Sequence, residues 1–186
     1  MDKKEAKLQY LRMRLEDSSI SEWEKNSIRQ RLGICNPVSE SDFTTRTGDE
    51  LFSFVYNYLE EQLSIIRRQK RTNSPLEFLP DNLRMINYLC IYSSTFDDDC
   101  LEQMYECEES VDEMRNLSQA FRTINRVDEA DLIDSVLQKQ EITREEVDLL
   151  QEHFWESDAI IQEIETAIEG FITVNISELL KLQTIQ

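Results

Sequence analysis

The chain has 186 residues, of which 40% are apolar, enough for one sizeable core and too many for a compositionally disordered protein. Its formal net charge of -18 is unevenly spread, since residues 1–76 carry 13 Lys/Arg and 12 Asp/Glu and residues 77–186 carry 7 and 26. Phosphates and anionic lipids are repelled by such a surface, so the charge argues against direct nucleic-acid binding and against membrane binding.

Two further features of the sequence indicate the cellular compartment of the protein. The chain has no apolar run of bilayer length, and its start, Met1 to Glu5, lacks the apolar core of a secretory signal. We therefore expect a cytoplasmic protein. Its four cysteines show no CxxC pairing and are expected to be free thiols in that reducing compartment: Cys35, Cys90, Cys100 and Cys107.

Apolar residues recur near every 3.6 positions, and only three glycines and three prolines interrupt them. The pattern predicts an all-α fold, a bundle-like single domain with an N-terminal helical hairpin. The hairpin covers residues 1–33, with one helix over about 3–16 and a second that Ser21 caps and Gly33 ends. Polar turn formers predict a loop over residues 34–48, and residues 49–186 are expected to form an acidic all-helical domain.

Within residues 49–186 the periodicity predicts a long amphipathic helix from about Asp49, followed by five or six shorter helices. Three of these helices are expected to begin at Asp81, at Asp128 and near Ser157, and two are expected over 98–107 and 111–124. A capping box from Thr143 to Glu146 predicts the start of another. The apolar faces of two of these helices are expected to lie in the core. The residues concerned are Leu132, Ile133, Val136, Ile161, Ile164, Ile168 and Phe171.

Catalytic and metal-binding patterns are missing from the sequence. His153 is the single histidine, beside Phe154 and Trp155, which favours a packed structural role over a catalytic one. Asp97 to Asp99 lack the glycine and the bidentate glutamate of an EF-hand loop, and a helix opening explains them. We therefore predict no enzyme activity, no catalytic residue, no metal site and no cofactor.

Carboxylates in the second part of the chain recur at intervals of three and four residues, which places them side by side on helices. Such neighbours repel one another, and few lysines are mixed among them. Rows of carboxylates on rigid helices resemble the anionic lattice of a nucleic-acid backbone. The predicted partner-binding residues are Asp97, Asp98, Asp99, Glu102, Glu106, Glu109, Asp112, Glu113, Asp128, Asp131, Asp134, Glu145, Asp148 and Glu152.

About half of the chain, roughly residues 81–175, resembles the bacterial DNA-mimic protein family. The likeness lies in the stretches 100–105, 117–124, 128–133 and 161–175, and Gln103 matches the glutamine of the family's glycine-aromatic-x-Gln-aromatic-aromatic signature. Members of the family are acidic all-α proteins that occupy DNA-binding surfaces of other proteins. The resemblance therefore implies the same fold class and the same mode of action here.

The leading hypothesis is an acidic protein that mimics nucleic acid and inhibits or regulates a basic DNA- or RNA-binding protein. A transcription regulator, a nuclease or a defence complex would be such a partner, as a phage or mobile element would need. The alternatives are an immunity or antitoxin-type inhibitor of one toxin, and a helical small-molecule binder or enzyme. The sequence is compatible with a homodimer.

Overall fold

The computed structural model describes residues 3–32, 34–92, 108–139 and 143–184, and every regular element in these ranges is helical. The predicted all-α fold is therefore confirmed. The elements are α1 Lys3–Glu16, α2 Glu22–Leu32, α3 Glu40–Thr44, α4 Gly48–Lys70, η1 Pro75–Phe78, α5 Asp81–Cys90, α8 Glu108–Thr123, α9 Val127–Leu137, α10 Arg144–Gln151, η2 Glu152–Glu156, α11 Asp158–Lys181 and η3 Leu182–Thr184.

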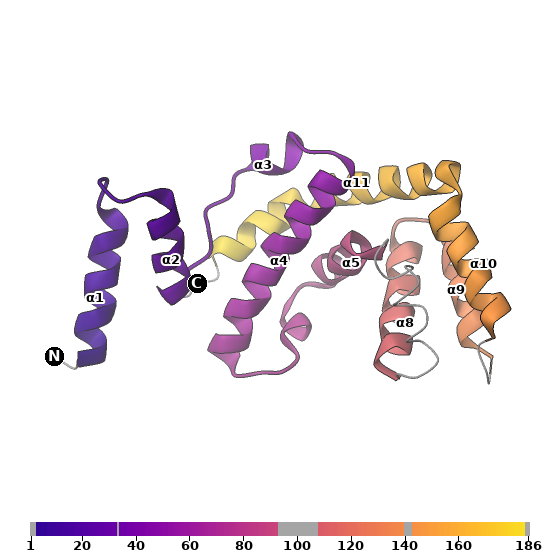
Figure 1. The fold of residues 1–186 in the computed structure, drawn as a ribbon, viewed down its shortest axis with the longest axis horizontal. Helices are drawn as coiled ribbons and strands as arrows, with labels where there is room; N and C mark the ends of the chain where they lie inside the picture. Colours follow the sequence, from indigo (N-terminus) through magenta and orange to yellow (C-terminus); the bar gives the residue numbers. More distant parts are fainter. Residues whose placement is uncertain (1–2, 33, 93–107, 140–142, 185–186) are drawn as a thin grey trace.

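The two long helices, α4 and α11, organise the molecule (Figure 1). Helix α11 runs from the end where α8, α9 and α10 stand together toward the end that holds α1 and α2. Inside the core, the Tyr58 hydroxyl of α4 donates a hydrogen bond to the backbone oxygen of Leu179 in α11, at 2.8 Å. The buried positions of α11 recur every four residues from Ile164 to Ile176, so its apolar stripe stays on the core along most of its length.

The predicted core residues lie on the expected faces, with differences at the edges. Ile133, Val136, Ile164 and Ile168 are buried, whereas the three others are half-buried: Leu132, Ile161 and Phe171. The stripe of α11 explains one difference, because its four-residue repeat extends back to Ile160, which packs on the core in place of Ile161.

The predicted loop over residues 34–48 is wrong in its middle, where α3 forms. The backbone N–H of Ser39 donates to the Asp42 carboxylate at 2.8 Å, which is one half of a capping box. The helix then buries Phe43, whose ring meets those of Phe54 and Tyr58 edge to face. One buried aromatic residue and a capping box hold a helix too short to show periodicity.

Several predicted boundaries are confirmed. Helices α1 and α2 begin and end within a residue or two of the expected positions, and α4 begins one residue before the expected Asp49. The predicted capping box at the start of α10 is present, with the backbone N–H of Thr143 donating to the Glu146 carboxylate at 2.7 Å. The helix predicted over 98–107 lies outside the described residues.

The N-terminal hairpin has an apolar cluster of its own, formed by Leu11, Ile20 and Ile28 with Leu15 and Leu32 at its edge. This cluster is separate from the main core, which extends from α3 and α4 to α11 and η3. The division of the chain at residues 33 and 49 stays a prediction.

Candidate functional site

Helices α8, α9 and α10 carry the described part of the predicted acidic face. Helices α8 and α9 form a tight pair, joined by a turn in which Asn125 takes the left-handed conformation, with φ 62°. Buried Met114, Leu117 and Phe121 hold α8 on the core, and Ile133 does the same for α9. The polar sides of these helices therefore face outward.

Eight predicted site residues can be placed with their side chains. Asp112, Glu113, Asp128, Asp131, Glu145, Asp148 and Glu152 are exposed, and Asp134 is half-buried. Glu109 belongs to α8. The other predicted residues lie outside the described ranges: Asp97, Asp98, Asp99, Glu102 and Glu106.

Two of the eight carboxylates join α8 to α9. Arg122 of α8 donates from one nitrogen to Asp131 and to Asp134 of α9, at 2.6 Å each, and the Ser118 hydroxyl donates to Asp134 at 2.6 Å. Partial burial tends to raise the pKa of Asp134, but the bonds from Ser118 and Arg122 outweigh it and hold that pKa below its usual range. These two carboxylates therefore stabilise the helix pair.

Two further carboxylates are paired within their own helices. Asp112 lies 2.7 Å from an Arg115 nitrogen, and Asp148 lies 3.0 Å from Nε of Arg144. Exposed pairs of this kind contribute little stability, about 0–1 kcal/mol, and a partner can replace the arginine.

The remaining four form a set that we call the free carboxylates: Glu113, Asp128, Glu145 and Glu152. Within the described ranges, none of them has a hydrogen bond or ion pair from its side chain. Burial raises the pKa of the Tyr56 and Tyr88 phenols, and the charge of Glu113 adds to both shifts, after that of Glu60 at Tyr56. Asp128 and Glu145 occupy the first turns of α9 and α10, where a negative charge complements the helix dipole.

A group of charged side chains around the buried Glu129 lies where α9, η2 and α11 meet, and sequence reasoning missed most of it. Glu129 is only 3% exposed; it pairs with Arg126 and lies 3.8 Å from Nε2 of His153. Arg126 also bonds Glu163 of α11 at 2.8 Å. The half-buried ring of His153 packs edge to face against the ring of Phe154. The i, i+3 spacing of Arg126 and Glu129 was the available signal.

A second missed group of carboxylates joins the start of α4 to the middle of α11. Glu169 accepts a hydrogen bond from the backbone N–H of Gly48. Burial, and then the charges of Asp49 and Glu169, raise the pKa of Glu165. Residues more than 110 positions apart meet here, and helical spacing cannot reveal such a meeting.

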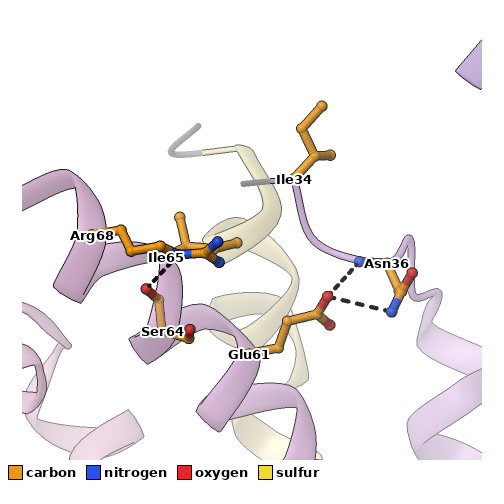
Figure 2. A pocket seen from close by; sticks show the side chains of 6 residues that line it. All are labelled: Ile34, Asn36, Glu61, Ser64, Ile65 and Arg68. Atoms are coloured by element: carbon orange, nitrogen blue, oxygen red, sulfur yellow. Dashed lines mark hydrogen bonds between the residues drawn. The ribbon is translucent and has the colours of Figure 1, made fainter. Parts of the chain in front are cut away.

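A pocket of about 520 Å³ lies between α4 and the segment that follows the hairpin (Figure 2). Glu61 accepts hydrogen bonds from the backbone N–H and the side-chain amide of Asn36, at 3.2 and 3.3 Å. Of its lining, only Ile34 and Ile65 are apolar, whereas small-molecule sites are lined mainly by apolar groups. The bonds in this pocket fasten the hairpin's connecting segment to α4.

Among the residues that the structure describes, no three His, Cys, Asp or Glu side chains form a group that could hold a metal ion. The Cys35 side chain is buried, and burial raises the pKa of the Cys90 thiol. No helix within the described ranges is both long enough and apolar enough to span a membrane.

Comparison with protein-family models, with curated proteins and with solved structures gives no match. These comparisons therefore add nothing to the resemblance to the DNA-mimic family, which stays a prediction.

Proposed function

We propose that the chain is an acidic binding protein that occupies the basic, nucleic-acid-binding surface of another protein, and so inhibits or regulates it. The observation that supports this proposal is the set of free carboxylates on α8, α9, α10 and the turn after α10, all exposed on helices anchored in the core.

The attraction between the two proteins would come from the basic groups of the partner. A basic cleft that binds phosphates attracts rigid carboxylates by the same electrostatic complementarity with which it attracts a nucleic acid, and salt screens that attraction. No arginine or lysine in the described part of the chain pairs with the free carboxylates, so their binding to a partner breaks no ion pair seen there. Asp112 and Asp148 can join them by exchanging an exposed intrahelical pair for one with the partner.

Asp131 and Asp134 belong to a different class, since they hold α9 against α8. Their charge reversal would loosen the helix pair as well as any interface. A test of the acidic face should leave them intact.

The test begins with capture of the partner from the cells of origin on the immobilised wild-type chain. We expect the captured protein to be a transcription regulator, a nuclease, or part of a defence complex. Wild type should compete with the partner's DNA or RNA, and its affinity should fall steeply as the salt concentration rises.

The variant for this test removes the free carboxylates: Glu113→Gln, Asp128→Asn, Glu145→Gln and Glu152→Gln. Its matched control removes four other exposed carboxylates with the same change in net charge: Glu5→Gln, Glu16→Gln, Glu40→Gln and Glu77→Gln. The first should lose at least about tenfold in affinity, or 1.4 kcal/mol, and the control little. Equal losses in both, or simultaneous binding of the chain and the nucleic acid, would reject the proposal.

A further inference from the structure

The apolar cluster of the N-terminal hairpin is poorly covered. It contains three buried apolar residues, and each of them retains 7–8% exposure, whereas many residues of the main core retain none. Helices of 14 and 11 residues gain most of their stability from packing and little from propensity. Two such helices alone leave much of their apolar surface in water, so a further layer on the hairpin would be stabilising.

The large apolar residues that a further layer on the hairpin would cover are exposed in the single chain. Trp23 is 79% exposed and Tyr10 is 61% exposed. Both line a groove of about 250 Å³ between α1 and α2, whose floor is Leu11 and Ile28. An indole and a phenol at the rim of an apolar groove are typical of the anchors that dominate protein interfaces.

The charges at the groove favour pairing with a like surface. Arg14 and Arg31 line it together with Glu24, and Arg14 lies 3.7 Å from Glu24. A two-fold interface places one patch against its own copy, so charged groups can pair across it only when the patch holds both signs of charge. An occupant of one sign would meet a like charge here.

The distribution of charge over the molecule also favours contact between two copies at the hairpin. Residues 1–33 hold 8 Lys/Arg and 6 Asp/Glu, a net of +2, whereas the rest of the chain holds 12 and 32, a net of -20. Most of this negative charge lies in residues 77–186, so two copies repel one another less at the hairpin than at the acidic helices. The hairpin also lies at the opposite end of the long axis from α8, α9 and α10 (Figure 1). Contact at this end keeps the two acidic faces far beyond the roughly 8–10 Å over which salt screens charge.

From these observations we infer that two copies of the chain associate through the groove between α1 and α2. The two hairpins form a four-helix bundle with Tyr10 and Trp23 at its centre, and the acidic faces point outward at its two ends. The inference is independent of the proposed function, because it uses no residue of the acidic face.

Sedimentation velocity over a range of protein concentrations tests the inference. Wild type should form a particle of twice 22.1 kDa. The double variant Tyr10→Ser/Trp23→Ser should raise the dissociation constant of this dimer at least about tenfold. Met13→Ser is the matched control: Met13 is 66% exposed on the same hairpin and does not line the groove, so this variant should dimerise as wild type does.

Folding is checked separately. Because both substituted side chains are exposed in the single chain, circular dichroism should show unchanged helix content. In a Trp155→Phe background, Trp23 is the only indole, and its emission should move to shorter wavelength as the dimer forms. A monomer at every concentration, a dimer equally tight in the double variant and the control, or no shift in Trp23 emission on association would overturn the inference.

Discussion

Glu165 and Asp134 are two carboxylates of the same chain in opposite surroundings. Glu165 is half-buried and faces the charges of Asp49 and Glu169, so its pKa is raised. Asp134 is also half-buried, but bonds from Ser118 and Arg122 lower its pKa in spite of that burial. Where the neighbours are cations and hydroxyls a carboxylate stabilises the fold, and where they are other carboxylates it opposes the fold.

The first prediction concerns Glu165. A raised pKa means that the folded chain holds this proton more tightly than the unfolded chain, so the stability it contributes is present at low pH and is lost as pH rises through the folded pKa. That window starts near the ordinary value of 4.5 and extends above it. Glu165→Gln should therefore be more stable than wild type at pH 7, by a few tenths of a kcal/mol, the scale of exposed like-charge contacts.

Urea denaturation at several pH values measures this effect. The gain of Glu165→Gln should shrink as the pH falls below the window. Asp134→Asn should show the opposite sign at pH 7, because it replaces one of the two accepting oxygens with an amide donor and removes the charge that pairs with Arg122. A wild type that is more stable than Glu165→Gln at pH 7 would contradict the prediction.

At the scale of elements, sequence patterns predicted what depends on nearby residues. Periodicity located α4 and α11, and the residues of a capping box located the start of α10. The same motif was present at Ser39 and Asp42, but α3 has five residues, too few for a period to appear. The candidate site shows the same limit: helical spacing predicted which carboxylates are exposed, and could not predict that Arg122 takes two of them for a contact between helices.

The second prediction concerns the buried stripe of α11. Ile164 has no exposed surface and lies in the main core, whereas Val174 of the same helix is 75% exposed. Ile164→Ala should lower the free energy of unfolding by about 2–5 kcal/mol, through lost burial and the cavity left behind. Val174→Ala should stay within about 0.5 kcal/mol of wild type. Chemical denaturation of the two variants compares them, and similar losses would mean that the stripe is assigned to the wrong face.

At the scale of the whole molecule, net charge acts on stability independently of any partner. The chain has 38 anionic and 20 cationic side chains, so repulsive pairs outnumber attractive ones. Its exposed ion pairs, such as Asp112 with Arg115, are each worth about 0–1 kcal/mol and are weakened by salt. Salt also weakens the long-range repulsion between the carboxylates. With a net charge of -18, this weakening stabilises the fold by more than the weakened ion pairs destabilise it.

The third prediction follows from this balance. Raising the concentration of NaCl from low to physiological strength should raise Tm, by about 3 °C for each kcal/mol gained in a chain of this length. The measurement should use Tyr10→Ser/Trp23→Ser, so that association does not contribute. KCl at equal ionic strength should act alike, because screening depends on ionic strength and not on the cation. A Tm that falls with salt would show that local ion pairs outweigh the repulsion.

Several hydrogen bonds of the fold join residues that lie far apart in the sequence. Gln183 exchanges two hydrogen bonds with the backbone of Val38, at 3.2 and 2.9 Å across 145 residues, and Tyr58 reaches Leu179 across 121. The pairs α1–α2 and α8–α9, in contrast, form between neighbours in sequence. Local pairs form fast, whereas contacts across such separations must first overcome the entropy of closing a long loop. Folding of this chain is therefore expected to proceed from two early helical hairpins to a late, slower docking of α11, and that last step sets the overall rate.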